Sequence, residues 1–179
     1  FLSAWLDPVA YTGQYALTRK LDGKKTMSRH IQFESQLSLA GCNADRRIQI
    51  RPSEQGIAVL ALYNALAAMA GRTGLAKKEV PCFAEIDAAA KQLWAARGRS
   101  LVISGSNETS VQVLVNAINM LLGNYGGAIS MALPSFLRKG DDAAALDLLS
   151  EMNRGEVDAL LMVNTNPVYT MPAPAAFEA

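Results

Sequence analysis

Two asparagines near the C-terminal end of the sequence, Asn164 and Asn166, directly follow the apolar stretch 159–163. Their side-chain amides could read the edge of a purine or a pterin, because an amide both donates and accepts hydrogen bonds. The apolar stretch has no polar alternation, which is typical of a parallel strand covered on both faces, and the loop after such a strand is a usual ligand position. A turn at Asn164 and a new segment beginning at Asn166-Pro167 explain the same residues without a ligand.

A second candidate is Gly105-Ser106-Asn107, between a predicted strand and a predicted helix. Backbone N–H groups at a helix N-terminus can bind a phosphate or another anion. The stretch is neither GxGxxG nor a P-loop. A simple helix cap at Ser106 or Asn107 is the favoured interpretation.

Arg46, Arg47 and Arg51 lie in the most polar segment and could clamp an anion, because guanidinium groups bind phosphates and carboxylates in a bidentate way. Strand alternation offers a plainer interpretation, with Ile48 and Ile50 inward and the polar side chains on an ordinary surface. The plainer interpretation is favoured.

The remaining reactive residue types form no catalytic pattern. His30 is the sole histidine and has no nucleophile motif around it, so it predicts a structural or surface residue. Asp141-Asp142 is explained as a helix start. Cys42 and Cys82 are 40 residues apart without a CxxC motif, so a metal site is not expected, and a disulfide and two free thiols both stay open.

The bulk properties fit one globular domain or one large piece of a longer protein, since the 179 residues carry a net charge of +1 and half of them are hydrophobic. No stretch is long and apolar enough for a membrane helix. Basic residues lack interleaved aromatic residues, so nucleic-acid binding is not expected. Both ends read as if cut from a longer chain, with 172–179 resembling the start of a helix.

The second half of the sequence alternates predicted strands and helices. Residues 100–104, 128–132 and 158–163 are strand-like, whereas 108–122 and a segment after Asp141 have helical spacing of apolar residues. Strand–helix–strand units predict a parallel sheet with right-handed crossovers. The expected fold class is therefore α/β, a three-layer Rossmann-like parallel sheet.

The first half is less regular. A helix is predicted from Pro8, a half-exposed strand over 28–37, a helix from Ser53 to Met69, and another helix that carries Phe83 and Trp94. The predicted organisation has three parts. Residues 1–71 end one α/β lobe, 72–99 form a connecting polar stretch and helix, and 100–179 form a Rossmann-like lobe.

Three segments, in order, resemble molybdopterin oxidoreductases and together cover most of the chain. "IRPSEQGIAVLALYNAL" resembles the "RPGTD…AL" helix entry of that family, and "LVISGSNETSVQVLVNAINMLLGNYGG" resembles its strand, loop and long helix. "MNRGEVDALLMVNTNPVYTMP" resembles its "…G.V.AL.…G.NP…..P" segment. The chain is thus expected to be a fragment of a larger molybdopterin-oxidoreductase-like protein.

The stretches "RHIQFESQLSLAGCNADRRIQIRPSEQ" and "GSNETSVQVLVNAINMLLGNYG" resemble one branch more closely, the large iron–sulfur subunit of alternative complex III. That resemblance implies a quinol:electron-acceptor oxidoreductase on the periplasmic side of the bacterial inner membrane. It implies membrane and cytochrome subunits and the other domains of the polypeptide as partners, with no membrane insertion of this region. Iron–sulfur clusters would lie elsewhere in the parent protein.

The same resemblance implies a molybdopterin-like fold without molybdenum cofactor. Gln55 stands where typical members have the acidic residue of "PGTD", and an amide cannot offer a guanine edge two acceptors. The leading hypothesis is a scaffold domain without catalytic residues, in a parent that belongs to an oxidoreductase. The alternative is an active molybdopterin-guanine-dinucleotide enzyme with Ser106, Asn107, Asn164 and Asn166 lining the cofactor channel. A free-standing nucleotide-binding domain is disfavoured because the glycine fingerprint is missing.

Overall fold

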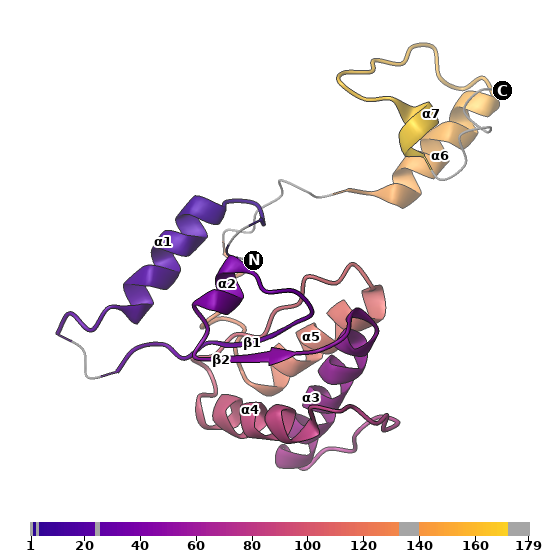
Figure 1. Ribbon diagram of the computed structural model, residues 1–179. Helices are drawn as coiled ribbons and strands as arrows, with labels where there is room; N and C mark the ends of the chain where they lie inside the picture. Colours follow the sequence, from indigo (N-terminus) through magenta and orange to yellow (C-terminus); the bar gives the residue numbers. More distant parts are fainter. Residues whose placement is uncertain (1, 3, 24–25, 133–139, 172–179) are drawn as a thin grey trace. The chain divides into compact units, whose positions relative to one another are not determined.

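The computed structural model describes residues 2, 4–23, 26–132 and 140–171 (Figure 1). The chain divides into two compact units, Phe1–Pro134 (unit 1) and Ser135–Ala179 (unit 2). The described residues form a mixed α/β structure that is mostly helical, with seven α-helices and one two-stranded parallel sheet. The predicted α/β class is confirmed at this level. The lobe boundaries at 71/72 and 99/100 stay predictions, and residues 172–179 lie outside the described part.

Unit 1 contains most of the secondary structure. Its elements are α1 (Pro8–Arg19), β1 (Ile31–Glu34), α2 (Leu39–Cys42), β2 (Arg46–Gln49), the 3-10 turn η1 (Pro52–Glu54), α3 (Gln55–Met69), α4 (Phe83–Ala95) and α5 (Thr109–Leu121). Unit 2 contains α6 (Asp142–Asn153) and α7 (Pro167–Thr170).

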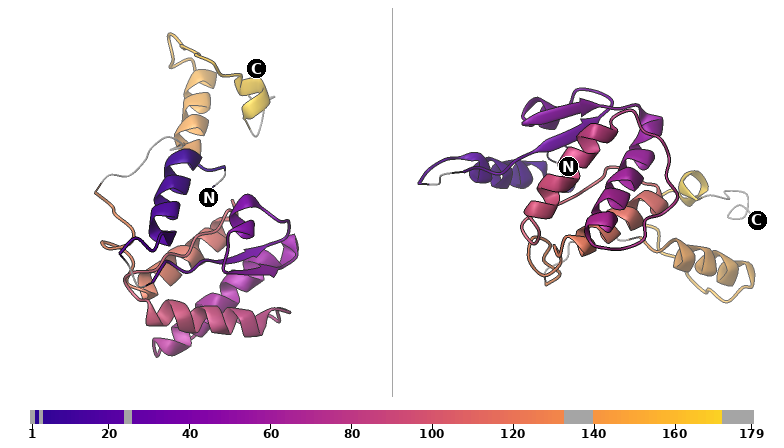
Figure 2. Two further views of the ribbon diagram at one scale, coloured as in Figure 1. Left: turned by 60° about the vertical axis from the view of Figure 1, so that its left-hand side comes forward. Right: turned by 90° about the horizontal axis from the view of Figure 1, so that it is seen from below.

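The sheet has one apolar and one polar face. β1 and β2 run parallel, with Phe33 opposite Ile48 and Gln32 opposite Arg47. Phe33, Ile48 and Ile50 pack with Ala58 of α3 and other apolar residues of α3 and α4 in one core cluster, on the side of the sheet where Figure 2 shows these helices. The half-exposed strand predicted over 28–37 is confirmed over its central four residues.

Helix α3 is the centre of unit 1, since both α4 and α5 pack against it. It joins them in a second core cluster that includes Leu66, Ala90, Ile118 and Leu122. All four side chains are fully buried. Ala90 lets α4 approach closely, and each large aliphatic side chain buried here contributes roughly 1.5–3 kcal/mol.

Helix ends follow the sequence signals closely. Asp7 and Asp141 accept backbone hydrogen bonds from the first turns of α1 and α6, as N-cap carboxylates do. Gly71, Gly123 and Gly155 follow α3, α5 and α6 with φ values between 65° and 70°. Only glycine adopts such angles without strain, so these positions stop the helices.

The three strands predicted in the second half do not form among the described residues. Residues 100–104 and 158–163 have no strand partner, and within 128–132 only Ile129 makes a single bridge, to Tyr125. A strand exists only where a neighbouring backbone supplies its hydrogen bonds, and among the described residues such bonds reach these three segments only at Ile129. The only sheet in the described part is the β1–β2 pair, so the three-layer parallel sheet is not observed there.

Candidate functional site

The loop 104–108 leads into α5 and contains the predicted residues Ser106 and Asn107. The Ser106 hydroxyl accepts a hydrogen bond from the Glu108 N–H at 3.1 Å, and its own N–H donates to the Ser104 hydroxyl at 3.2 Å. The Gln112 amide donates to the carbonyls of Ser104 and Ser106, at 3.1 and 2.6 Å. The loop is therefore held by its own serine hydroxyls and by the Gln112 amide of α5.

The electrostatics of this loop do not favour an anion. The N-cap residue of α5 is Glu108, not Ser106 or Asn107, and its side chain makes no capping hydrogen bond. An acidic residue at the N-cap adds negative charge near the helix N-terminus, which makes a second anion there less favourable. Asn107 is exposed and makes no hydrogen bond within the described residues.

Asn164 and Asn166 are both exposed and belong to the turn that begins α7. Asn164 has a φ of 52°, a left-handed conformation that asparagine tolerates better than most residues. Asn166 is the N-cap of α7, and its carbonyl accepts hydrogen bonds from the N–H groups of Tyr169 and Thr170. The interpretation in which Asn164 turns the chain and Asn166-Pro167 begins a segment describes the observed backbone.

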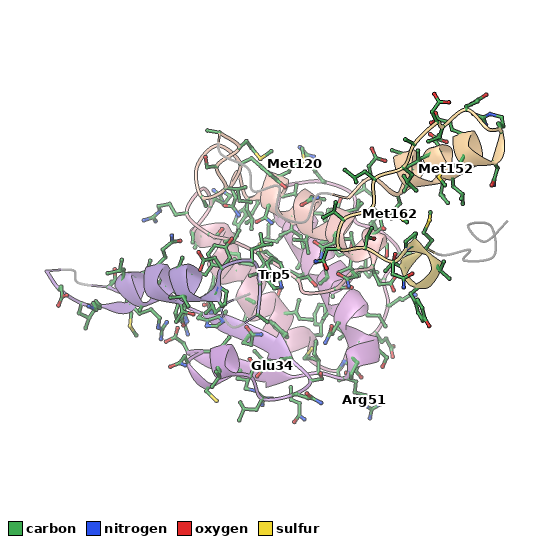
Figure 3. The ribbon with its side chains drawn as sticks, turned by 90° about the horizontal axis from the view of Figure 1, so that it is seen from above. Trp5, Glu34, Arg51, Met120, Met152 and Met162 are labelled. Atoms are coloured by element: carbon green, nitrogen blue, oxygen red, sulfur yellow. The ribbon has the colours of Figure 1, made fainter. Side chains whose placement is uncertain are left out.

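An apolar pocket of about 290 Å³ lies beside this turn within unit 2. Its walls come from α6, from the extended stretch after it and from α7, and they include Leu149, Met152 and Met162 (the two methionines are labelled in Figure 3). Asn164 and Asn166 are not among the lining residues. The pocket can hold an apolar group, but the two amides that would read a heterocycle do not face it.

The four predicted site residues thus fall into two pairs. Ser106 and Asn107 belong to unit 1, whereas Asn164 and Asn166 belong to unit 2. Each pair is close in sequence as well as in space. The structure of each unit by itself assembles no four-residue channel.

A group of interacting titratable side chains lies elsewhere, beside the N-terminal end of β1. Arg19 makes a bidentate ion pair with Asp45, at 2.7 and 2.9 Å, and Asp45 also accepts the His30 N–H at 2.7 Å. The Arg19 guanidinium and this N–H hold the pKa of Asp45 well below its usual range. The Tyr15 hydroxyl contacts Nδ1 of His30 at 3.0 Å, and partial burial raises the pKa of Tyr15.

The polar chain continues along β1 to Glu34. His30 Nε2 lies 3.0 Å from the Gln32 amide oxygen, and Gln32 in turn reaches Glu34. Burial would raise the pKa of Glu34, but hydrogen bonds from Ser38 and Arg47 outweigh it and lower the pKa. A side chain at Gly41 would overlap the Glu34 carboxylate, so α2 approaches the sheet only because this residue is glycine.

Each member of this chain is already paired, which indicates a structural network. His30 agrees with the expected structural histidine, since both ring nitrogens have partners. Sequence reasoning missed the network, although His30, Gln32 and Glu34 occur at the spacing of one strand face and Tyr15 and Arg19 at the spacing of one helix face.

The arginine segment is an ordinary surface strand, as favoured from the sequence. Ile48 and Ile50 are buried, and Arg46, Arg47 and Arg51 lie beside the carboxylates of Glu85, Glu34 and Glu54. Figure 3 labels Glu34 and Arg51. Arg47 is tightly paired with Glu34, whereas Arg46 and Arg51 lie 3.7 and 4.0 Å from their acidic partners.

Asn119 and Asn124 are two buried polar residues that sequence reasoning also missed. The Asn119 amide donates to the carbonyls of Val102 and Val115 and accepts from the Val102 N–H and from Asn124, at 2.8–3.1 Å. Asn124 accepts from the Ser100 hydroxyl at 3.2 Å. An asparagine on the apolar face of a predicted helix was the available signal. The pair fixes residues 100–102 to α5.

The two cysteines and the acidic residues of the described part are scattered over the structure. In that part of the chain no three His, Cys, Asp or Glu side chains come together as a metal site would require. Cys42 is exposed, Cys82 is buried, and both are free thiols, which resolves the alternative that the sequence left open. No helix in the described ranges combines the length and apolarity that a membrane crossing requires.

Comparison with protein-family models found no match for this chain, and comparison with curated proteins found none either.

Proposed function

We propose that this chain is a scaffold region of a membrane-associated bacterial complex that takes electrons from quinol. It would belong to the large iron–sulfur subunit of an oxidoreductase, on the periplasmic side of the inner membrane. The proposal starts from the ordered resemblance of residues 50–66, 101–127 and 152–172 to molybdopterin oxidoreductases. The first two segments include most of α3 and all of α5, and both helices contribute to one core cluster.

The observation that carries the scaffold role is the exposure of the apolar stretch before Asn164. Leu161 is 89% exposed and Val163 is 74% exposed. No backbone group of 158–163 has a hydrogen-bond partner within the described residues. Contiguous exposed apolar surface of this kind marks an interaction site. A three-layer Rossmann-like parallel sheet in a larger parent protein would cover it.

The proposed state of the fold is one without molybdenum cofactor. The Ser106 hydroxyl is engaged within its own loop, the N-cap residue of α5 is the acidic Glu108, and Gln55 replaces the family's acidic residue. Iron–sulfur clusters would lie in other parts of the parent. In this proposal the region has no catalytic residue, and its partners are the neighbouring domains and the membrane and cytochrome subunits.

One observation favours a second candidate, an active molybdopterin enzyme. Asn107 and Asn164 are exposed, and their side chains make no hydrogen bond among the described residues. Both amides are therefore free to read a pterin or a guanine edge in the parent protein.

The deciding experiment is metal and pterin analysis of the full-length parent, purified from its native membranes. The scaffold role predicts iron without molybdenum, tungsten or pterin fluorescence. In the scaffold case, Asn107→Ala and Asn164→Ala change complex assembly or stability only. Stoichiometric molybdenum or tungsten with pterin, lost in the two asparagine variants, would overturn the proposal in favour of the second candidate.

A further inference from the structure

The hydrogen bonds along β1 have a direction that is fixed at Glu34. Glu34 is paired with Arg47 and its pKa is lowered, so its carboxylate only accepts hydrogen bonds. The Gln32 amide faces this carboxylate through Nε2, at 3.5 Å, because a carboxylate repels the amide oxygen. The amide oxygen of Gln32 lies instead 3.0 Å from Nε2 of His30, so this ring nitrogen must carry a hydrogen.

Nδ1 is therefore the nitrogen of His30 that gains or loses a proton. In the neutral ring Nδ1 has only a lone pair to offer, and the Tyr15 hydroxyl lies 3.0 Å away. The same hydroxyl also donates to the Asn43 carbonyl, at 3.2 Å. A hydroxyl has a single hydrogen, so the two acceptors compete for it while the ring is neutral.

Protonation of the ring removes this competition. A proton taken from solvent by Nδ1 makes this nitrogen a donor to the Tyr15 oxygen, and the hydroxyl hydrogen then belongs to the Asn43 carbonyl alone. Both heavy-atom distances already suit these bonds. Tyr15 of α1 would then be joined to β1 and to the loop before β2 by two hydrogen bonds in place of one shared hydrogen.

We propose that the Tyr15 hydroxyl is a two-position switch that responds to the charge of the His30 ring. It donates to His30 while the ring is neutral and to the Asn43 carbonyl once the ring is protonated. The protonated state ties α1 more firmly to β1 and to the loop before β2. This inference concerns unit 1 alone and does not depend on the proposed electron-transfer role.

The neighbouring ionisable groups keep their charge while the ring titrates. Among the described residues they come from α1, from the ends of β1, from the loop before β2 and from β2, namely Tyr15, Arg19, Arg29, Glu34, Asp45 and Arg47. The pKa values of Asp45 and Glu34 are lowered, that of Tyr15 is raised, and arginine stays protonated. None of them therefore changes its charge between about pH 5 and 8, the range in which histidine side chains generally titrate.

The first test determines the ring tautomer in the native full chain. His30 is the only histidine in the sequence, so its ring signals are unambiguous. Long-range ¹H–¹⁵N correlation spectra at about pH 8, where histidine is generally neutral, are expected to show hydrogen on Nε2 and none on Nδ1. Hydrogen on Nδ1 in the neutral ring would overturn the proposal, because Tyr15 would then accept from the ring in both charge states.

The second test follows the Asn43 carbonyl by its ¹³C chemical shift. In the native chain this shift is expected to change in step with the ring nitrogens as pH falls from about 8 to 5. Tyr15→Phe is expected to leave the ring titration in place and to remove most of the Asn43 response. Tyr125→Phe is the control, since it removes a tyrosine hydroxyl bonded elsewhere, to Asn116. An Asn43 response that persists in Tyr15→Phe would overturn the switch, because the ring charge would then act on the carbonyl directly.

Amide hydrogen exchange measures the effect on α1. After correction for the intrinsic pH dependence of exchange, protection of the amides around Tyr15 is expected to rise about twofold to tenfold when the ring is protonated, as one additional hydrogen bond would produce. Tyr15→Phe is expected to abolish the rise, and circular dichroism checks that both variants keep their helices. Unchanged protection in the native chain would overturn the proposed tightening.

Discussion

Residues 100–104 and 158–163 are equally strand-like in sequence, yet the structure treats them differently. The first segment alternates between half-buried and exposed residues, and the Asn119 amide bonds both backbone groups of Val102. In the second segment no side chain among the described residues bonds the backbone in this way, and its side chains from Leu160 to Val163 are all exposed. An apolar run of residues does not by itself determine where a segment packs or which strand it pairs with. A polar side chain at the right place on a neighbouring helix can supply what a strand would supply.

The largest expected effect on stability comes from Asn119→Ala, which removes the side chain that bonds the Val102 backbone. Asn119 is 2% exposed, and its loss leaves the Val102 groups and the Asn124 amide without partners in a buried region. We expect unit 1 to lose about 3 kcal/mol of unfolding free energy. Urea titration followed by tryptophan fluorescence measures it, since Trp5 and Trp94 both belong to unit 1.

Asn116→Ala is the matched control on the same helix. Asn116 is exposed and accepts one hydrogen bond, from Tyr125, so its loss should cost less than about 1 kcal/mol. Equal costs for the two variants would show that Asn119 does not hold the segment.

Asp45 belongs to a second region of unit 1 that is held by polar contacts between side chains and backbone. Its pKa is depressed by the Arg19 pair and by the His30 N–H. A carboxyl whose pKa is lower in the folded than in the unfolded chain stabilises the fold above the unfolded pKa of about 3.9, and this stabilisation is lost as pH falls further. Asp45→Asn should therefore cost about 1 kcal/mol at pH 7 and progressively less below pH 4, measured by urea titration at several pH values. If Asp45→Asn lowers the unfolding free energy by the same amount at every pH, the loss does not come from ionisation of the carboxyl group.

Gln112→Ala tests whether the loop 104–108 depends on the hydrogen bonds that it receives from Gln112 of α5. Its amide donates to the Ser104 and Ser106 carbonyls, both of which water can reach when the side chain is gone. The expected loss is about 1 kcal/mol, with faster amide exchange confined to 104–108. Gln92→Ala on α4 is a control for loss of a glutamine side chain, because the buried Gln92 amide oxygen has no hydrogen-bond partner among the described residues. Exchange that accelerates throughout α5 would contradict a purely local clamp.

The smallest stability effect is expected from Leu161→Ser in the unsupported segment. Leu161 is 89% exposed, so its truncation should change the unfolding free energy of the chain by less than about 0.5 kcal/mol. Leu149→Ser, at a buried position on α6, is the control and should unfold unit 2, as circular dichroism would show. A large loss at Leu161 would mean that the chain alone already covers the segment.

Local signals predicted local structure well. The helix starts predicted at Pro8 and at Asp141 are confirmed, because helix-start signals depend only on adjacent residues. The inward positions of Ile48 and its neighbours followed from alternation. Pairing was not predictable, because a strand is defined by a partner that can come from any part of a chain.

The candidate site was predicted less well. The asparagines at 164 and 166 were identified as a turn or a ligand loop, and the observed turn matches the first alternative. The buried pair Asn119 and Asn124 was missed because helical spacing placed apolar residues around it and hid its polar role. The His30 network required α1, the loop before β2 and the strand itself, which no local pattern connects.

The bond between Asn119 and Val102 also restricts topology. Because one edge of residues 100–104 is closed by a side chain of α5, any sheet that includes this segment can extend from it in one direction only. In the described structure the Asn119 amide takes the place of a neighbouring strand at Val102, so the segment has the position of a border strand. A single asparagine amide would then set the strand order, and the direction of growth, of whatever larger sheet this chain joins.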